Sequence, residues 1–105
     1  MLNKLTGITQ RYEEINRQLM EVGDDYQRAT ELSKERAELE PIIQKAEEYR
    51  KTLESLEEAR SLRESDDPEL AELAEMEIAE LEPRIPELER EIKTLLLPKD
   101  PRDER

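Results

Sequence analysis

Residues 67–98, DPELAELAEMEIAELEPRIPELEREIKTLLLP, decide the fold that this sequence predicts. Their apolar residues recur at alternating intervals of three and four, which places side chains along one narrow stripe of a helix. These positions are Ala71, Ala74, Ile78, Leu81, Ile85, Leu88, Ile92 and Leu95. A helix with one apolar stripe is stable only when the stripe packs against a partner. The rest of the chain is therefore expected to supply partner helices.

The composition favours helices and a small core. Only 34% of the 105 residues are hydrophobic and 44% are charged, a balance that also occurs in disordered chains. The apolar positions are periodic, however, and Glu, Leu, Ala, Lys and Arg are abundant, which favours long helices. Three tyrosines without Phe or Trp leave no material for a large globular core. We expect an all-α, elongated, antiparallel coiled-coil bundle.

The first two helices are predicted from the same spacing. Apolar residues at intervals of three and four predict a helix over about 2–22, and its seam is Leu2, Leu5, Ile8, Tyr12, Ile15, Leu19 and Val22. Gly23 follows where a helix commonly ends on a left-handed residue, and Asp24 or Asp25 can cap the next helix. That helix is expected over about 26–63, antiparallel to the first because the connection is short. Its seam is Leu32, Leu39, Ile42, Ala46, Tyr49, Leu53 and Leu56, with Glu35 or Arg36 in a polar gap.

Pro41 interrupts the second helix. A proline inside a helix removes one backbone hydrogen bond and clashes with the preceding turn. Because the seam continues in register on both sides, we expect a kink. The alternative is two helices that meet at Pro41.

The third helix is expected over about 68–97. Asp67 is a suitable N-cap, with Pro68 at the first helical position. Pro83 and Pro86 lie off the seam, so they should bend or loosen this helix without removing a core residue. Pro98 and Pro101 end this helix. Residues 98–105 are expected to form a linker toward a missing downstream domain. The interdomain linker residues are Pro98, Lys99, Asp100 and Pro101.

Helix lengths predict the architecture. At 1.5 Å per residue the helices span roughly 30, 57 and 45 Å, so the first covers only half of the second. We expect one helical domain over 1–97, with a three-helix bundle near Pro98 that tapers to a two-helix hairpin.

Negative charge is concentrated at the far end of that hairpin. The net charge is −12, and residues 64–97 carry 12 acids against 3 bases. Such a surface repels phosphate, so little direct contact with nucleic acid is expected, and a basic protein is the better partner. A solvated helix face is the plainer alternative. We call the following candidate partner-binding set the acidic tip: Glu64, Asp66, Asp67, Glu69 and Glu72.

The sequence offers no active site. It has no His and no Cys, so the usual zinc sites and nucleophile–base pairs are absent. Gly7 and Gly23 are isolated and form no phosphate-binding loop. We therefore expect no enzyme, no catalytic residue, no metal site and no cofactor. The beginning of the chain shows no secretory signal, and no run is apolar enough for a membrane span, so a cytoplasmic protein is expected.

Three segments resemble a known family. The runs LSKERAELEPI (32–42), DDPELAELA (66–74) and LLLPKDPRDE (95–104) resemble, in order and spacing, the N-terminal domain of bacterial class-I peptide chain release factors. The resemblance is best to the UAA/UAG-reading type and covers nearly the whole chain. LLLPKDP after an acidic helix is its most specific part. Pro83, Pro86 and a short connection over 23–28 depart from the family pattern.

The resemblance implies a role in translation termination at stop codons. It implies that the codon-reading domain and the Gly-Gly-Gln loop lie in a longer protein, outside this chain. Its implied partners are the ribosome, through a stalk-base protein, and indirectly the GTPase release factor. The alternative is a free-standing acidic coiled-coil scaffold or chaperone-like protein. Self-association of the isolated chain through an exposed two-helix seam is compatible with both hypotheses.

Overall fold

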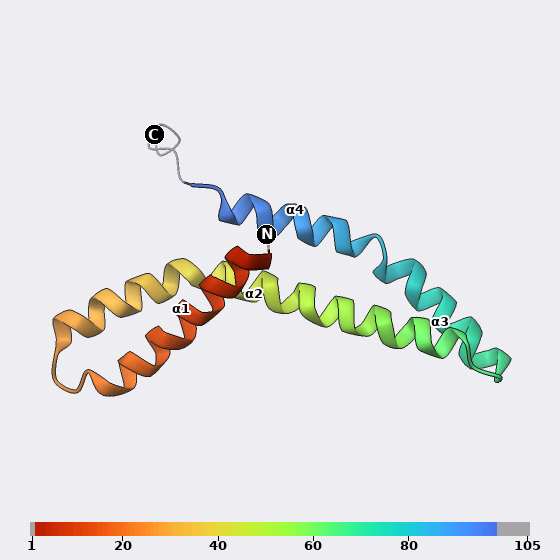
Figure 1. The fold of residues 1–105 in the computed structure, drawn as a ribbon, viewed down its shortest axis with the longest axis horizontal. Coiled ribbons are helices and arrows are strands. Elements are labelled where there is room, and N and C mark those ends of the chain that lie inside the picture. The colour runs from red at the N-terminus through yellow and green to blue at the C-terminus, as the bar shows by residue number, and fades with distance from the viewer. Residues whose placement is uncertain (1, 99–105) are drawn as a thin grey trace. The chain divides into compact units, whose positions relative to one another are not determined.

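The structure is all-α over the residues that it describes. The computed structural model describes residues 2–98, which form four helices and no strand (Figure 1). The helices are α1 (Leu2–Glu21), α2 (Tyr26–Arg63), α3 (Pro68–Leu81) and α4 (Arg84–Leu96). The predicted fold class, all-α, is confirmed.

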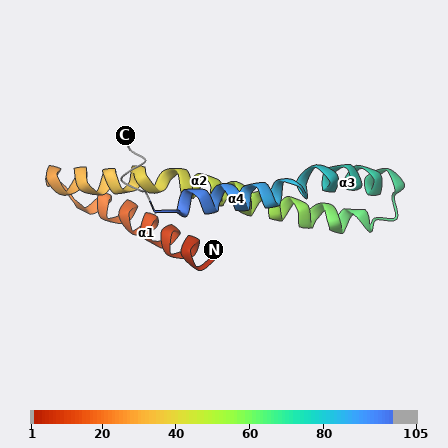
Figure 2. The same ribbon diagram turned by 90° about the horizontal axis from the view of Figure 1, so that it is seen from above.

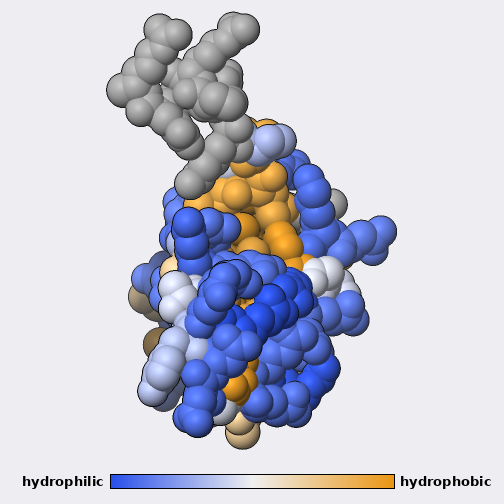
Figure 3. Space-filling model, turned by 90° about the vertical axis from the view of Figure 1, so that its left-hand side faces the viewer, coloured by the Kyte–Doolittle hydropathy of each residue, from blue (hydrophilic) through white to orange (hydrophobic). Residues whose placement is uncertain are grey.

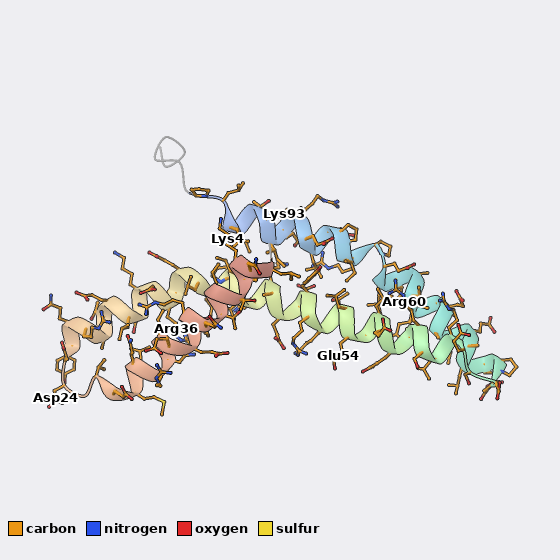
Figure 4. All side chains as sticks on the ribbon, in the orientation of Figure 1. Lys4, Asp24, Arg36, Glu54, Arg60 and Lys93 are labelled. Atoms are coloured by element: carbon orange, nitrogen blue, oxygen red, sulfur yellow. The ribbon has the colours of Figure 1, made fainter. Side chains whose placement is uncertain are left out.

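The connection between α1 and α2 forms as predicted. Gly23 has φ of 55°, in the left-handed region where glycine avoids the steric cost of a side chain. The Asp25 carboxylate then accepts a hydrogen bond of 3.0 Å from the backbone N–H of Arg28. This bond satisfies one of the donors that the first turn of α2 leaves without a helical partner. Asp24 lies in the same turn (Figure 4).

Pro41 does not break α2. The helix runs without interruption from Tyr26 to Arg63, so the alternative of two helices meeting at Pro41 is wrong. Pro41 is exposed to solvent, whereas Ile42 after it is half-buried. The helix therefore continues past the proline, and the kink expected at Pro41 stays a prediction.

The third predicted helix is divided in two. The sequence predicted one helix over 68–97, whereas α3 ends at Leu81 and α4 begins at Arg84. Pro83 has no N–H for the helical ladder, and its ring crowds the preceding turn. Pro86 falls in the first turn of α4, where a missing N–H costs little. The backbone N–H of Ile85 instead bonds to the carbonyl oxygen of Glu82 at 3.3 Å.

The prolines leave the seam intact. Ile78 before the interruption and Leu88 after it are both buried. Leu81 and Ile85, on either side of it, pack against the core. The prediction that the prolines loosen this segment without removing a core residue is confirmed.

The residues divide into two compact units, the first up to Gln44 and the second from Lys45. In the first unit α1 packs on the beginning of α2 with Ile15 and Leu32 fully buried. The Tyr12 hydroxyl donates to Glu40, and the Arg28 guanidinium donates to Gln18, so residue numbers rise along one helix and fall along the other. The two segments are therefore antiparallel.

In the second unit α3 and α4 run antiparallel to the end of α2 (Figures 1 and 2). A core of Leu56, Ala59 and Ile78 joins α2 to α3. Leu88 and Ile92 of α4 have no exposed surface. Arg60 donates to Glu82, and the Arg60 side chain is labelled in Figure 4.

The predicted seams account for most of the core. Three residues of these seams are exposed instead of buried or half-buried. They are Leu2, Leu53 and Leu95, with 65%, 41% and 38% of their surface exposed. Charged and polar side chains cover most of the face shown in Figure 3, as the composition requires. The single domain over 1–97 and the three-helix section near Pro98 stay predictions.

Candidate functional site

The turn between α2 and α3 brings the acidic tip together. Backbone N–H groups of Glu64 and Ser65 bond to carbonyl oxygens of the last turn of α2, at 3.2 and 3.0 Å. The Ser65 hydroxyl oxygen then accepts a bond of 3.1 Å from the N–H of Asp67. α3 begins directly afterwards at Pro68. All five tip residues are exposed, three in this turn and two in the first turns of α3.

The tip carries uncompensated negative charge. Among the ion pairs of residues 2–98, Arg63 pairs with Glu75 at 3.7 Å, and no pair includes a residue of the acidic tip. The sequence of α3, PELAELAEMEIAEL, contains no base. Glu77 and Glu80 likewise take part in none of the ion pairs in this part of the chain. The carboxylates therefore present a negative potential to solvent.

Asp67 differs from its neighbours because it has a structural role. Its carboxylate accepts a hydrogen bond of 3.0 Å from the N–H of Glu69, and its carbonyl oxygen accepts the N–H of Ala71. It is thus the N-cap of α3, as predicted.

We expect Asp67→Ala to destabilise the protein by about 1 kcal/mol, because the first turn of α3 loses its capping acceptor. Asp67→Asn keeps an acceptor oxygen and should cost much less, although it removes the same charge. Urea unfolding followed by circular dichroism measures both. Equal losses for the two variants would assign the effect to charge and contradict the capping role.

A second polar cluster joins α2 to α4 within the second unit. Arg84 donates to Glu48 at 2.8 Å and to Glu91 at 2.9 Å. Lys45 pairs with Glu91 at 2.9 Å and with Glu48 at 3.4 Å. Arg84 also pairs with Glu87 of its own helix at 3.2 Å, so two bases and three acids form one network. The Arg84 hydrogen bond lowers the pKa of Glu48, and the Lys45 hydrogen bond lowers the pKa of Glu91.

This network predicts a pH-dependent stability. The carboxyl groups of Glu48 and Glu91 both have pKa values in the folded protein below the 4.5 of the free side chain. Their contribution is therefore fully present above pH 4.5 and is lost as the pH falls through the lower folded values. We expect Arg84→Gln to lower the melting temperature more at pH 7 than at pH 3.

Arg90→Gln is the matched control for Arg84→Gln. Arg90 lies on the same helix, is exposed, and takes part in none of the ion pairs that the described residues form. Its replacement should produce a smaller difference between the two pH values. If the loss of melting temperature differs between pH 7 and pH 3 by the same amount in both variants, the network contributes no specific stabilisation.

A third polar layer lies in the first unit. Arg11 forms a bidentate pair with Glu35, at 2.5 and 2.6 Å, and its hydrogen bonds lower the pKa of Glu35. The Tyr12 hydroxyl donates to Glu40 at 2.5 Å, which raises the pKa of Tyr12. Arg36 lies 4.9 Å from the centre of the Tyr12 ring, a cation–π distance. The polar gap in the predicted seam is thus occupied by residues with partners on α1.

Among the described residues, the second unit has open grooves beside α4 and on α3. The larger, about 530 Å³, lies beside α4 and is lined by the network and its neighbours: Lys45, Arg84, Glu87, Arg90, Glu91, Thr94 and Leu95. The smaller, about 300 Å³, lies on α3 and is lined by Glu69, Glu72, Leu73 and Met76. Sequence reasoning missed Leu73 and Met76 as surface residues. Their position off the seam of Ala71, Ala74 and Ile78 was the available signal.

Among the described residues, the second unit thus presents exposed carboxylates and open grooves on its helix surfaces. Within residues 2–98, no three His, Cys, Asp or Glu side chains are placed to hold a metal ion. None of the helices in this range has the length and hydropathy to cross a bilayer. Of the predicted linker residues, Pro98 is described and exposed, whereas Lys99, Asp100 and Pro101 lie outside the described residues.

Comparisons with known proteins give one consistent result. The family model described as PCRF domain matches residues 8–105. Peptide chain release factor 1 of Aliarcobacter butzleri is 51% identical over 98% of this chain and 29% of its own length. The protein of the same name from Nitratiruptor is 53% identical over 97% of this chain and 29% of its length. That from Campylobacter jejuni is 50% identical over the whole chain and 30% of its length.

The chain thus spans about three tenths of the length of the curated relatives that it matches. No solved structure matches it. The segments that carried the resemblance in the sequence, residues 32–42, 66–74 and 95–104, all fall inside the matched range.

Proposed function

The chain belongs to the PCRF domain family, and on that premise we propose that it is the helical N-terminal part of a peptide chain release factor. In this proposal the chain positions the factor on the ribosome during translation termination, in the cytoplasm. The observation that carries the proposal is about 50% identity, over nearly the whole chain, to proteins named peptide chain release factor 1. The codon-reading and Gly-Gly-Gln regions lie in the rest of the factor.

The acidic tip is the proposed contact with the ribosome. Its charges are exposed and form no ion pairs among the described residues, so they are available to a basic surface. A basic protein at the base of the ribosomal stalk fits this potential, whereas ribosomal RNA repels it. Through the same contact with the ribosome, this domain would act indirectly on the GTPase release factor. Pro98, Lys99, Asp100 and Pro101 then connect the helices to the remainder of the factor.

The test uses the full factor that contains this chain. Four tip acids are neutralised together, Glu64→Gln, Asp66→Asn, Glu69→Gln and Glu72→Gln, and Asp67 is kept because it caps α3. We expect ribosome association to slow by about tenfold at low salt, with the difference shrinking at high salt, because steering by surface charge is screened. Stopped-flow binding and the rate of peptide release measure the effect.

A matched control separates the tip from total charge. Glu13, Glu21, Glu38 and Glu58 are also exposed and belong to none of the ion pairs in the described residues. Changing these four to Gln removes the same charge elsewhere. If both sets of changes slow association equally, or neither does, the tip is not the contact. The reading frame after Arg105 gives a simpler check, because a continuation with Gly-Gly-Gln supports a release factor and its absence supports a free-standing scaffold.

A further inference from the structure

The outer face of α3 carries an exposed apolar pair. Leu73 and Met76 are each 61% exposed, and Leu70 beside them is 43% exposed. The core side of the same helix is already occupied by Ala74 and Ile78, which are 2% and 4% exposed. Leu73 and Met76 are three residues apart, so they are neighbours on the helix surface. They therefore form a second apolar surface, separate from the seam.

This pair lines a groove with an acidic border. Glu69 and Glu72 line the groove with the two apolar side chains. Glu77 and Glu80 follow on the same helix, and none of these four glutamates belongs to an ion pair among residues 2–98. A methionine and a leucine beside these carboxylates favour an apolar residue carried by a basic segment, because both apolar burial and charge are then complementary.

We propose that this face of α3 docks a basic amphipathic helix of another protein. The leucine-like side chains of that helix would cover Leu73 and Met76, and its Lys or Arg residues would pair with Glu69, Glu72, Glu77 and Glu80. A second copy of this chain is disfavoured as occupant, because α3 contains no base and would face its own acids. Glu69 and Glu72 belong both to this face of α3 and to the acidic tip, so this inference rests in part on the proposed function.

The apolar pair separates this inference from the acidic tip. If charge alone recruits the partner, neutralising glutamates weakens binding and changing Leu73 or Met76 does not. If the partner helix packs into the groove, both changes weaken binding. A few residues near the centre of an interface contribute most of the binding energy, whereas charges at its rim mainly affect association rate and salt dependence.

The test measures binding of this chain to a synthetic amphipathic peptide. The probe is about 18 residues of leucine and lysine with all leucines on one helical face, long enough to hold a helix on binding. A scrambled peptide of the same composition is the control probe. The variant Leu73→Gln/Met76→Gln removes the apolar pair and keeps good helix formers. We expect its dissociation constant to rise at least tenfold, measured by fluorescence anisotropy.

The matched control variant changes the same residue types elsewhere. Met20 and Leu97 are 87% and 67% exposed, and Met20→Gln/Leu97→Gln should leave binding unchanged. Circular dichroism should show equal helix content in all variants, because the replaced side chains are exposed. Glu69→Gln/Glu72→Gln should weaken binding mainly at low salt.

Three other results of these binding experiments would each contradict one part of the proposal. Unchanged binding by Leu73→Gln/Met76→Gln, with weaker binding by the glutamate variant, overturns the groove and leaves the tip proposal standing. Equal binding of the scrambled peptide overturns the requirement for an amphipathic helix. Sedimentation that shows a dimer dependent on Leu73 and Met76 would make a second copy the occupant and overturn the basic partner.

Discussion

Leu88→Ala is expected to lower the free energy of unfolding by about 2–5 kcal/mol, the range for a leucine truncated in a packed core. Leu88 lies on α4 with no exposed surface. Removing its side chain forfeits the transfer free energy and leaves a cavity that neighbouring helices fill only in part. A protein of this size is stable by about 5–15 kcal/mol, so the loss is a large fraction of the total.

The control for Leu88 is a leucine on the same helix. Leu95 is 38% exposed, and Leu95→Ala should cost clearly less because its site remains open to water. Urea unfolding followed by circular dichroism gives both values, and similar slopes would show that the same surface unfolds in each variant. If both substitutions lowered the free energy of unfolding equally, the result would contradict the burial of Leu88 in the core of the second unit.

Ala59→Leu is expected to destabilise the protein by about 1–3 kcal/mol. Ala59 is 1% exposed and lies in the core with Leu56 and Ile78. A larger side chain there has no space and must displace its neighbours. The heptad spacing by itself would favour leucine here, because position 59 continues the apolar seam three residues after Leu56.

Ala37 supplies the control for this change. It lies on the same helix and is exposed, so Ala37→Leu should change stability by no more than about 0.5 kcal/mol. Thermal unfolding of the two variants distinguishes a crowded site from a general effect of leucine on α2. A stabilising Ala59→Leu would show that the helices separate more widely at this level than the structure has them.

The heptad pattern predicted the fold because it reports burial directly. Ile15, Leu32, Ile78 and Ile92 all stand on predicted seams and are all buried. Ala59 was missed because alanine is compatible with any helix face, and only the approach of α3 reveals that its position is crowded. The divided third helix was missed for a related reason. An unbroken seam predicts register, whereas the backbone hydrogen bonds lost at Pro83 decide whether the helix is continuous.

The distribution of charge in the sequence predicts the acidic tip, but only the structure distinguishes the roles of its residues. Sequence placed Asp67 as a cap and as a contact residue, and the structure shows the capping bond. The network of Arg84 with Glu48 joins residues 36 apart in the chain, so no local spacing predicts it. Leu73 and Met76 stand off the seam, which marks them as surface residues only once the seam is known to be buried.

The interruption at Glu82 and Pro83 also determines how the second unit opens from its native state. Helix formation is cooperative along an uninterrupted ladder of hydrogen bonds, and the prolines separate that of α3 from that of α4. α4 holds two side chains with no exposed surface, whereas the buried residues of α3 are one alanine and one isoleucine. α3 should therefore open at a lower free energy than α4, and its amide protons should exchange with solvent first. The backbone of α3 can thus rearrange while α4 keeps its place on α2.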